Sequence, residues 1–259
     1  MNDFYIGYLP KAPIVLGRFV RRVIVVLGLL AVAVALALVF AQMPFANSTF
    51  EYGKLRTFEG MVVARPYPTL LVARPGEAQQ KERHSLYLLV APGKHGADDL
   101  IATFDGKQVR LHGQVIYREG RTMVEIVPGS IVTLNTAPAA PETVRELGVV
   151  TVTGEIVDSK CYLGVMNPGN GKVHRDCAAR CLSGGTPPIL VTSDGNDQLL
   201  LVGADGLALG RDALREFIAE PLTIRGELLQ RGETRLLKID PHTLSHTPDG
   251  IQTALRKSQ

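Results

Sequence analysis

Three cysteines and one histidine in the second half of the chain have the residue types and the spacing of a metal site. They form the pattern Cys-x12-His-x2-Cys-x3-Cys and are Cys161, His174, Cys177 and Cys181. Three thiolates and one imidazole are a donor set that suits tetrahedral Zn²⁺. Three soft sulfur donors also suit copper(I) or an iron centre. The sequence therefore predicts a metal ion bound by these four side chains, with zinc as the first candidate.

Local sequence around these residues explains how they can meet. Residues 174–182 have a composition typical of a helix, which Gly184-Gly185 would end. At about 100° per residue, the last three donors share about 60° of one helix face. Cys161 follows a predicted strand, and we expect the chain to bring it back to that face. We expect Asp158 to orient His174 or another ligand by a hydrogen bond, without binding the metal itself.

Two other uses of the cysteines stay open at this point. Outside the cytoplasm disulfides persist, so Cys161 can pair with Cys177 or Cys181 and leave one odd thiol. The leftover thiol can also be reactive, because His174 and Arg175 are basic neighbours near a helix N-terminus. The pattern does not match the Cys-x2-Cys-His of covalent haem attachment, and we exclude that group.

The same segment resembles part of a group of bacterial proteins. The matching positions run Gly154-x3-Asp158-x2-Cys161-Tyr162 and then His174-x2-Cys177-Ala178-x2-Cys181-x2-Gly184-Gly185-x-Pro187. This pattern is similar to a segment of poorly characterised, small bacterial proteins that are exported or membrane-anchored. The resemblance covers this segment alone. It implies a setting in the bacterial envelope and a joint role for the Cys and His positions, and it brings no known reaction.

The elements that must position these residues are mainly β and come in two copies. Residues 109–128 and 222–241 match without a gap at a constant offset of 113. Each copy is expected to run strand, strand, strand, short helix, strand, strand, which is the order of the OB-fold, a five-stranded barrel. The short helices are expected at 98–104 and 211–218. The cysteines lie in an insert of the second copy, whose part before Lys172 is expected to be loop.

These copies give the predicted domain organisation. We expect a first OB-like domain at 55–134, a Pro/Ala-rich linker at 135–147, a second OB-like domain at 148–244 with the Cys/His insert at 159–187, and a polar tail at 245–259.

A membrane segment precedes the two barrels. Residues 23–41 are 19 consecutive apolar residues, enough to approach the thickness of a bilayer core. We expect a cytoplasmic leader at 1–22 and a transmembrane helix at 23–43. Arg21 and Arg22 flank its N-terminal side, so the positive-inside rule places the barrels in the periplasm of a bacterium, anchored by a single pass through the inner membrane. The alternative is a cleaved signal peptide, whose apolar core is usually shorter.

Charge and motifs narrow the function further. The net charge of +3 resides in residues 1–22, and residues 23–259 sum to zero with few aromatics, which argues against nucleic-acid binding. The sequence contains no phosphate loop, nucleophile elbow or His-Glu-x-x-His motif. We assign no catalytic residue and expect an accessory or assembly subunit of an envelope redox system, with membrane or periplasmic proteins as partners. The alternative is a non-catalytic interaction subunit stapled by a disulfide.

Overall fold

The fold is known from a computed structural model. It describes residues 13–42, 48–74, 84–136, 143–195 and 197–246. Most of the predicted leader and tail, and the centre of the predicted linker, lie outside these residues.

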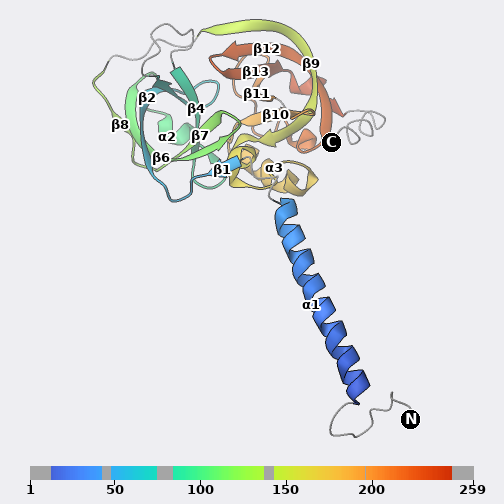
Figure 1. The fold of residues 1–259 in the computed structure, drawn as a ribbon. Coiled ribbons are helices and arrows are strands. Elements are labelled where there is room, and N and C mark those ends of the chain that lie inside the picture. Colours follow the sequence, from blue (N-terminus) through green and yellow to red (C-terminus); the bar gives the residue numbers. More distant parts are fainter. Residues whose placement is uncertain (1–12, 43–47, 75–83, 137–142, 196, 247–259) are drawn as a thin grey trace. The chain divides into compact units, whose positions relative to one another are not determined.

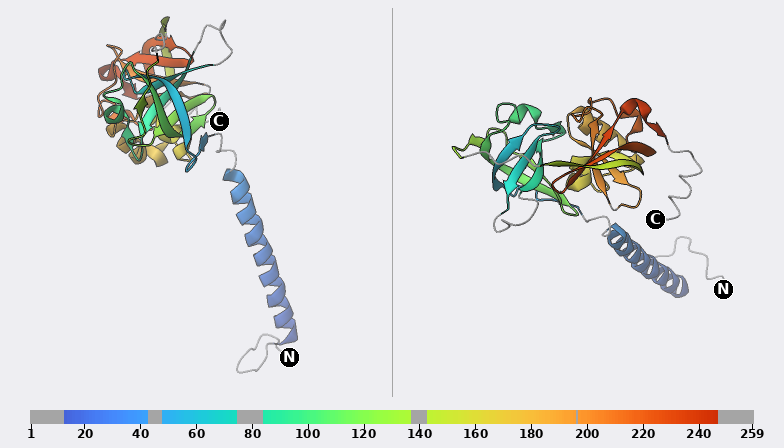
Figure 2. Two further views of the ribbon diagram at one scale, coloured as in Figure 1. Left: turned by 90° about the vertical axis from the view of Figure 1, so that its left-hand side faces the viewer. Right: turned by 90° about the horizontal axis from the view of Figure 1, so that it is seen from above.

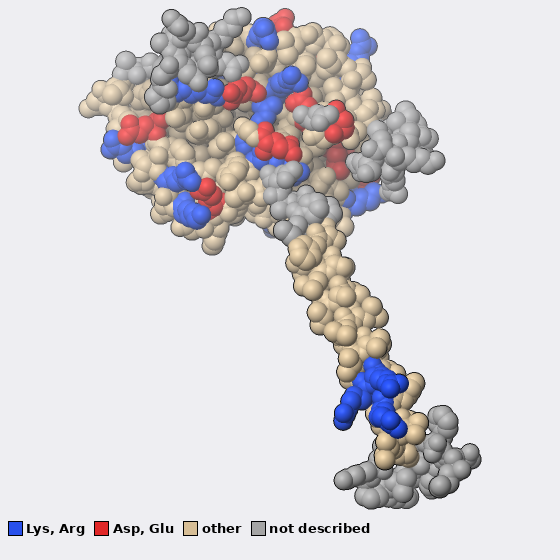
Figure 3. Space-filling model, viewed as in Figure 1, with Lys and Arg blue, Asp and Glu red and all other residues tan. Residues whose placement is uncertain are grey.

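An apolar helix, α1 (Ile14–Gln42), forms the first unit of the chain. Its 29 residues correspond to about 43 Å, more than the roughly 30 Å of a bilayer's hydrocarbon core. It begins earlier than the expected residue 23, so Arg18, Arg21 and Arg22 lie on the helix and form the blue cluster in Figure 3. A helix of this length and composition can span a membrane, and a signal sequence has the same properties.

The first barrel has the predicted OB-like topology (Figure 1). Antiparallel pairing links neighbouring strands, and a parallel pairing of Leu88 with Met123 closes the barrel. The five strands and the intervening helix are β2 (Arg56–Val63), β3 (Thr69–Ala73), β4 (His84–Ala91), α2 (Asp98–Ile101), β6 (Gln108–Arg118) and β7 (Arg121–Ile126). Three short strands extend this sheet: β1 (Ser48–Phe50), β5 (His95–Gly96) and β8 (Val132–Thr133).

The second barrel repeats this topology. Its closure is again a parallel pairing, here of Leu200 with Leu236. Its strands are β9 (Val144–Asp158), β10 (Pro188–Thr192), β11 (Gln198–Gly203), β12 (Pro221–Arg231) and β13 (Thr234–Ile239), and β14 (Ser245–His246) pairs with β12. The cysteine insert lies between β9 and β10 and contains the turns η2 (Cys161–Val165) and η3 (Lys172–His174) and the helix α3 (Arg175–Ser183).

Equivalent glycines mark the same close approach of strands in both barrels. A Cβ on Gly60 would lie 2.3 Å from the Leu71 carbonyl oxygen, and one on Gly154 would lie 2.2 Å from the Val191 carbonyl oxygen. Both glycines sit on the first strand of a barrel, opposite the second strand. A side chain cannot fit where the two backbones approach this closely. The two copies therefore share this glycine position as well as the order of strands.

The structure also differs from the sequence prediction in local features of the barrels and the insert. The predicted helix at 211–218 is reduced to a 3-10 turn at Arg215–Phe217, because Ile218 is drawn into a bridge with Ile156 and a helix this short is marginal by itself. Strand β9 begins at Val144, inside the expected linker, because it pairs with β12 up to Arg231. The start of the insert forms the π-type turn η2 instead of a loop.

The two barrels pack against each other within one compact unit (Figure 2). Tyr67 of the first barrel joins an apolar cluster of the second that includes Tyr162 and Leu200. Leu163 of the insert joins a cluster of the first barrel with Ile116 and Met123. The insert that holds the cysteines is therefore packed between two cores and not attached to one barrel alone.

Candidate metal centre

Two of the three cysteines lie on α3, as the sequence predicts. The helix is ended by the two glycines that follow it: the Gly184 N–H donates to the Arg180 carbonyl at 3.1 Å, and Gly185 adopts a φ of 94°. Positions four residues apart lie above one another on a helix. Cys177 and Cys181 therefore point from adjacent turns toward the same region.

Cys161 meets this face of α3 from the η2 turn, as expected. Its Sγ lies 3.8 Å from that of Cys177 and 3.9 Å from that of Cys181, and all three sulfurs lie within 4.8 Å of one another. No disulfide joins the three thiols. A tetrahedral ion with metal–sulfur bonds of about 2.3 Å holds its sulfurs about 3.8 Å apart. The three cysteines thus have the spacing of metal ligands.

His174 and Asp158 form a second group that overlaps the first at Cys161. Ligand atoms of Asp158, Cys161 and His174 lie within 4.8 Å of one another. His174 precedes α3 and is buried, and its Nε2 lies 2.9 Å from Asp158 Oδ2. The group of three sulfurs does not include His174. The structure therefore brings the predicted histidine next to one cysteine and leaves it outside the sulfur cluster itself.

Asp158 occupies the orienting position that the sequence predicts. It is the last residue of β9 and is fully buried. Its Oδ1 accepts a hydrogen bond of 2.8 Å from the Cys161 N–H, while Oδ2 contacts the His174 ring. One carboxylate thus fixes both the backbone that carries a sulfur and the imidazole beside it. A carboxylate bound to a histidine is the usual support of a metal-ligating imidazole.

The hydrogen bond between Cys161 and Cys181 shifts the acidity of both thiols. This bond, together with burial, raises the pKa of Cys161 well above its ordinary value. The same bond lowers the pKa of Cys181. Cysteines bind metal ions as thiolates, so a metal ion would displace the thiol protons on binding.

Sequence reasoning missed Lys94, a residue of the first barrel that contacts the cluster. It lies between β4 and β5, and its Nζ donates to Cys177 Sγ at 2.9 Å. This hydrogen bond raises the pKa of Lys94. Cys177 is only partly buried, whereas Cys161 and Cys181 are buried. Lys94 thus places a positive charge on the open side of the cluster. No local signal could have found it, because 83 residues separate the two side chains.

Lys160 is a second residue that the sequence did not reveal. It is 2% exposed although it is charged, and it precedes Cys161 directly. Its Nζ donates to the carbonyls of Ala91 at 2.8 Å and Gly93 at 2.6 Å, and it forms an ion pair of 2.5 Å with Glu125. All three partners belong to the first barrel. A buried ion pair with further hydrogen bonds holds the start of the insert against that barrel.

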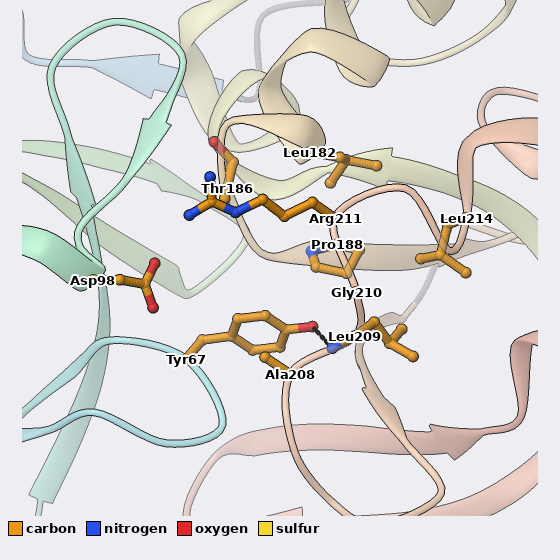
Figure 4. Close-up of a pocket in the computed structure, with 11 residues that line it drawn as sticks. Tyr67, Asp98, Leu182, Thr186, Pro188, Ala208, Leu209, Gly210, Arg211 and Leu214 are labelled. Atoms are coloured by element: carbon orange, nitrogen blue, oxygen red, sulfur yellow. Dashed lines mark hydrogen bonds between the residues drawn. The ribbon is translucent and has the colours of Figure 1, made fainter.

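Two further side chains of the first barrel attach it to the second. The Arg118 guanidinium donates to the Tyr162 carbonyl at 3.2 Å and lies 4.1 Å from the centre of the Tyr162 ring. The Tyr67 hydroxyl donates to the Leu201 carbonyl at 2.8 Å and accepts from the Leu209 N–H, which Figure 4 draws as a dashed line. Burial raises the pKa of this tyrosine. Arg118 thus contacts the insert itself, and Tyr67 contacts the body of the second barrel.

A cavity of about 100 Å³ lies beside the C-terminal end of α3 (Figure 4). Tyr67, Asp98 and Arg211 line it, and the charged groups come from different barrels. None of the three cysteines lines it. The cavity is therefore separate from the sulfur cluster, although both lie where the barrels meet.

Comparisons with known proteins do not add a function to this geometry. No protein-family model matches the sequence, and no curated protein matches it.

Proposed function

We propose that the protein is a membrane-anchored periplasmic metalloprotein whose second barrel binds a metal ion. The ligands are Cys161, Cys177 and Cys181, with His174 as the fourth donor and Asp158 holding that histidine in place. The observation that carries the proposal is the spacing of three sulfurs that no disulfide joins. The Sγ of Cys161 lies 3.8 Å from that of Cys177 and 3.9 Å from that of Cys181. Zinc is the first candidate, and copper or iron also suit three sulfur donors.

The location and the wider role follow from charge and compartment. The basic residues of α1 lie near its N-terminal end, so the positive-inside rule favours a cytoplasmic N-terminus with both barrels in the periplasm. Nothing among the described residues resembles an established catalytic arrangement apart from the thiols. We therefore propose an accessory or assembly subunit of an envelope redox system that works with other membrane or periplasmic proteins.

The alternative is an interaction subunit in which a disulfide staples the insert. Cys161 would pair with one of the two α3 cysteines, to which it lies almost equally close, and leave one thiol free. A disulfide brings two sulfurs to about 2.05 Å, so either pairing needs a movement of about 1.8 Å.

Elemental analysis of the full chain, purified in a nonionic detergent without chelators, tests the proposal. One metal ion per chain is expected, and substituting Cys161→Ser or His174→Ala should lower that ratio. His242→Ala is the matched control, because His242 is exposed and far along the chain from the insert. Cobalt substitution should give sulfur-to-cobalt charge-transfer bands that Cys161→Ser removes.

Counting thiols separates the two functions. Three thiols that become reactive only after chelation support a metal centre. A single reactive thiol in the untreated protein, with no bound metal even after reduction and reconstitution, rejects the metal centre and favours the disulfide-stapled interaction subunit.

A further inference from the structure

We infer that the metal centre is shared by the two barrels, with Lys94 of the first barrel as a positioning residue whose ammonium group holds the Cys177 thiolate. Metal binding and docking of the barrels are then coupled. This inference rests on the proposed metal site and assigns a residue and a regulatory consequence to it. Lys94 is not itself a ligand, because a protonated amine has no lone pair to offer.

The first support is the contact between Lys94 and the cluster. Its Nζ lies 2.9 Å from Cys177 Sγ, within the range of a charge-assisted hydrogen bond. A divalent ion bound by three thiolates carries a net charge of −1, and copper(I) in the same site carries −2. A lysine at the open edge of the site offsets part of this charge, which stabilises the loaded state more than an empty site whose thiols are protonated and carry no charge.

The second support is that one short segment of the first barrel, residues 91–94, contacts both chain segments that carry sulfur ligands, η2 and α3. Ala91, at the end of β4, and Gly93, in the turn after it, accept hydrogen bonds from Lys160, which directly precedes Cys161. The next residue of that turn, Lys94, reaches Cys177 on α3. The two ligand-bearing segments are therefore fixed to the same short piece of the first barrel.

The third support is close backbone packing at the other end of α3. The Gly96 N–H donates to the Gly184 carbonyl at 3.0 Å. A Cβ on Gly184 would lie 1.8 Å from the Lys94 carbonyl oxygen. Lys94 thus touches α3 with its backbone near the C-terminal end and with its side chain near Cys177. A shift of α3 on loss of metal would disturb this backbone packing, and separation of the barrels would in turn disturb the site.

Metal titration of Lys94 variants of the full chain in detergent tests the inference. The probes are Co²⁺ alone, followed by absorption, and Zn²⁺ in competition with a chromogenic chelator. Lys94→Met keeps the length of the side chain and removes the charge, and it should weaken binding by about 10- to 100-fold, the usual effect of losing a partner of a metal ligand. Lys94→Arg should retain most of the affinity. Lys107→Met, at another exposed lysine of the first barrel, should match the wild type.

Hydrogen exchange provides a readout that a general loss of affinity would not give. Removing the metal from the wild type should speed exchange in the peptide that contains the Gly96 amide, and adding it back should restore protection. In Lys94→Met saturated with metal, exchange of this peptide should stay faster than in the loaded wild type, and the sulfur-to-cobalt charge-transfer band should shift because the Cys177 sulfur has lost its hydrogen bond.

The outcomes separate the two proposals. Wild-type affinity, band position and exchange in Lys94→Met would overturn the shared site while leaving the metal centre intact. Failure of the wild type to bind Co²⁺ or Zn²⁺ would overturn the zinc centre and the inference with it. Weaker binding in Lys94→Met, with recovery in Lys94→Arg and faster exchange at Gly96, supports the inference.

Discussion

Replacing Lys160 with methionine is expected to destabilise the protein more than any surface charge change in the insert. The substitution keeps the apolar length of the side chain and removes the ammonium group. Glu125, itself 7% exposed, would lose its ion partner at 2.5 Å, and the carbonyls of Ala91 and Gly93 would each lose a donor. Removing one member of a buried ion pair costs about 3–5 kcal/mol, because the other charge stays buried without compensation.

Urea unfolding of the full chain in detergent, followed by far-UV circular dichroism, measures this cost. Tyrosine fluorescence is a second probe, since the chain has no tryptophan. Lys172→Met is the matched control within the same insert: Lys172 forms a 3.7 Å ion pair with Glu220 but its side chain is 72% exposed, so its loss should cost less than about 1 kcal/mol.

A double variant isolates the origin of the effect. Adding Glu125→Gln to Lys160→Met removes the stranded carboxylate, so the double variant should be more stable than Lys160→Met alone. A cost for Lys160→Met no larger than that of Lys172→Met would refute the reasoning, since it would mean that the ion pair is not buried between the insert and the first barrel. Equal stability of the single and double variants would show that the uncompensated charge is not the cause.

Two further substitutions test the packing and the electrostatics of the insert. Gly184→Ala should lower the midpoint of thermal unfolding by several degrees, because the new Cβ would collide with the Lys94 carbonyl. Gly210→Ala is the control: its Cβ would lie 3.8 Å from the nearest atom, so the midpoint should stay almost unchanged. Equal midpoints for the two variants would contradict the contact between Gly184 and Lys94. Burial raises the pKa of Glu155, so the folded state binds its proton more tightly than the unfolded chain and this residue makes stability fall as pH rises above about 4.5. Glu155→Gln should therefore increase the free energy of unfolding at pH 7 but not at pH 4, and an equal change at both pH values would contradict the assignment.

Local sequence patterns determined the elements and part of the site. The apolar run predicts α1 by its length and composition, and the repeat at a constant offset predicts two copies of one fold. The glycines after residue 183 predict the end of α3. The four-residue spacing of Cys177 and Cys181 placed both thiols on one face of α3. The nearness of Asp158 to the cluster was also predictable, since it lies three residues before Cys161, and the structure shows it in contact with the Cys161 amide and the His174 ring.

Only the tertiary structure decided what surrounds the cluster. Lys94 lies 83 residues from Cys177, and Lys160 lies 69 residues from Ala91, so no local spacing in the sequence predicts either contact. The separation of His174 from the sulfur group depends on how η2 and α3 fold back on each other. Contacts between two barrels arise from the shape of both surfaces, and a pattern within one segment carries no information about the surface that it will meet.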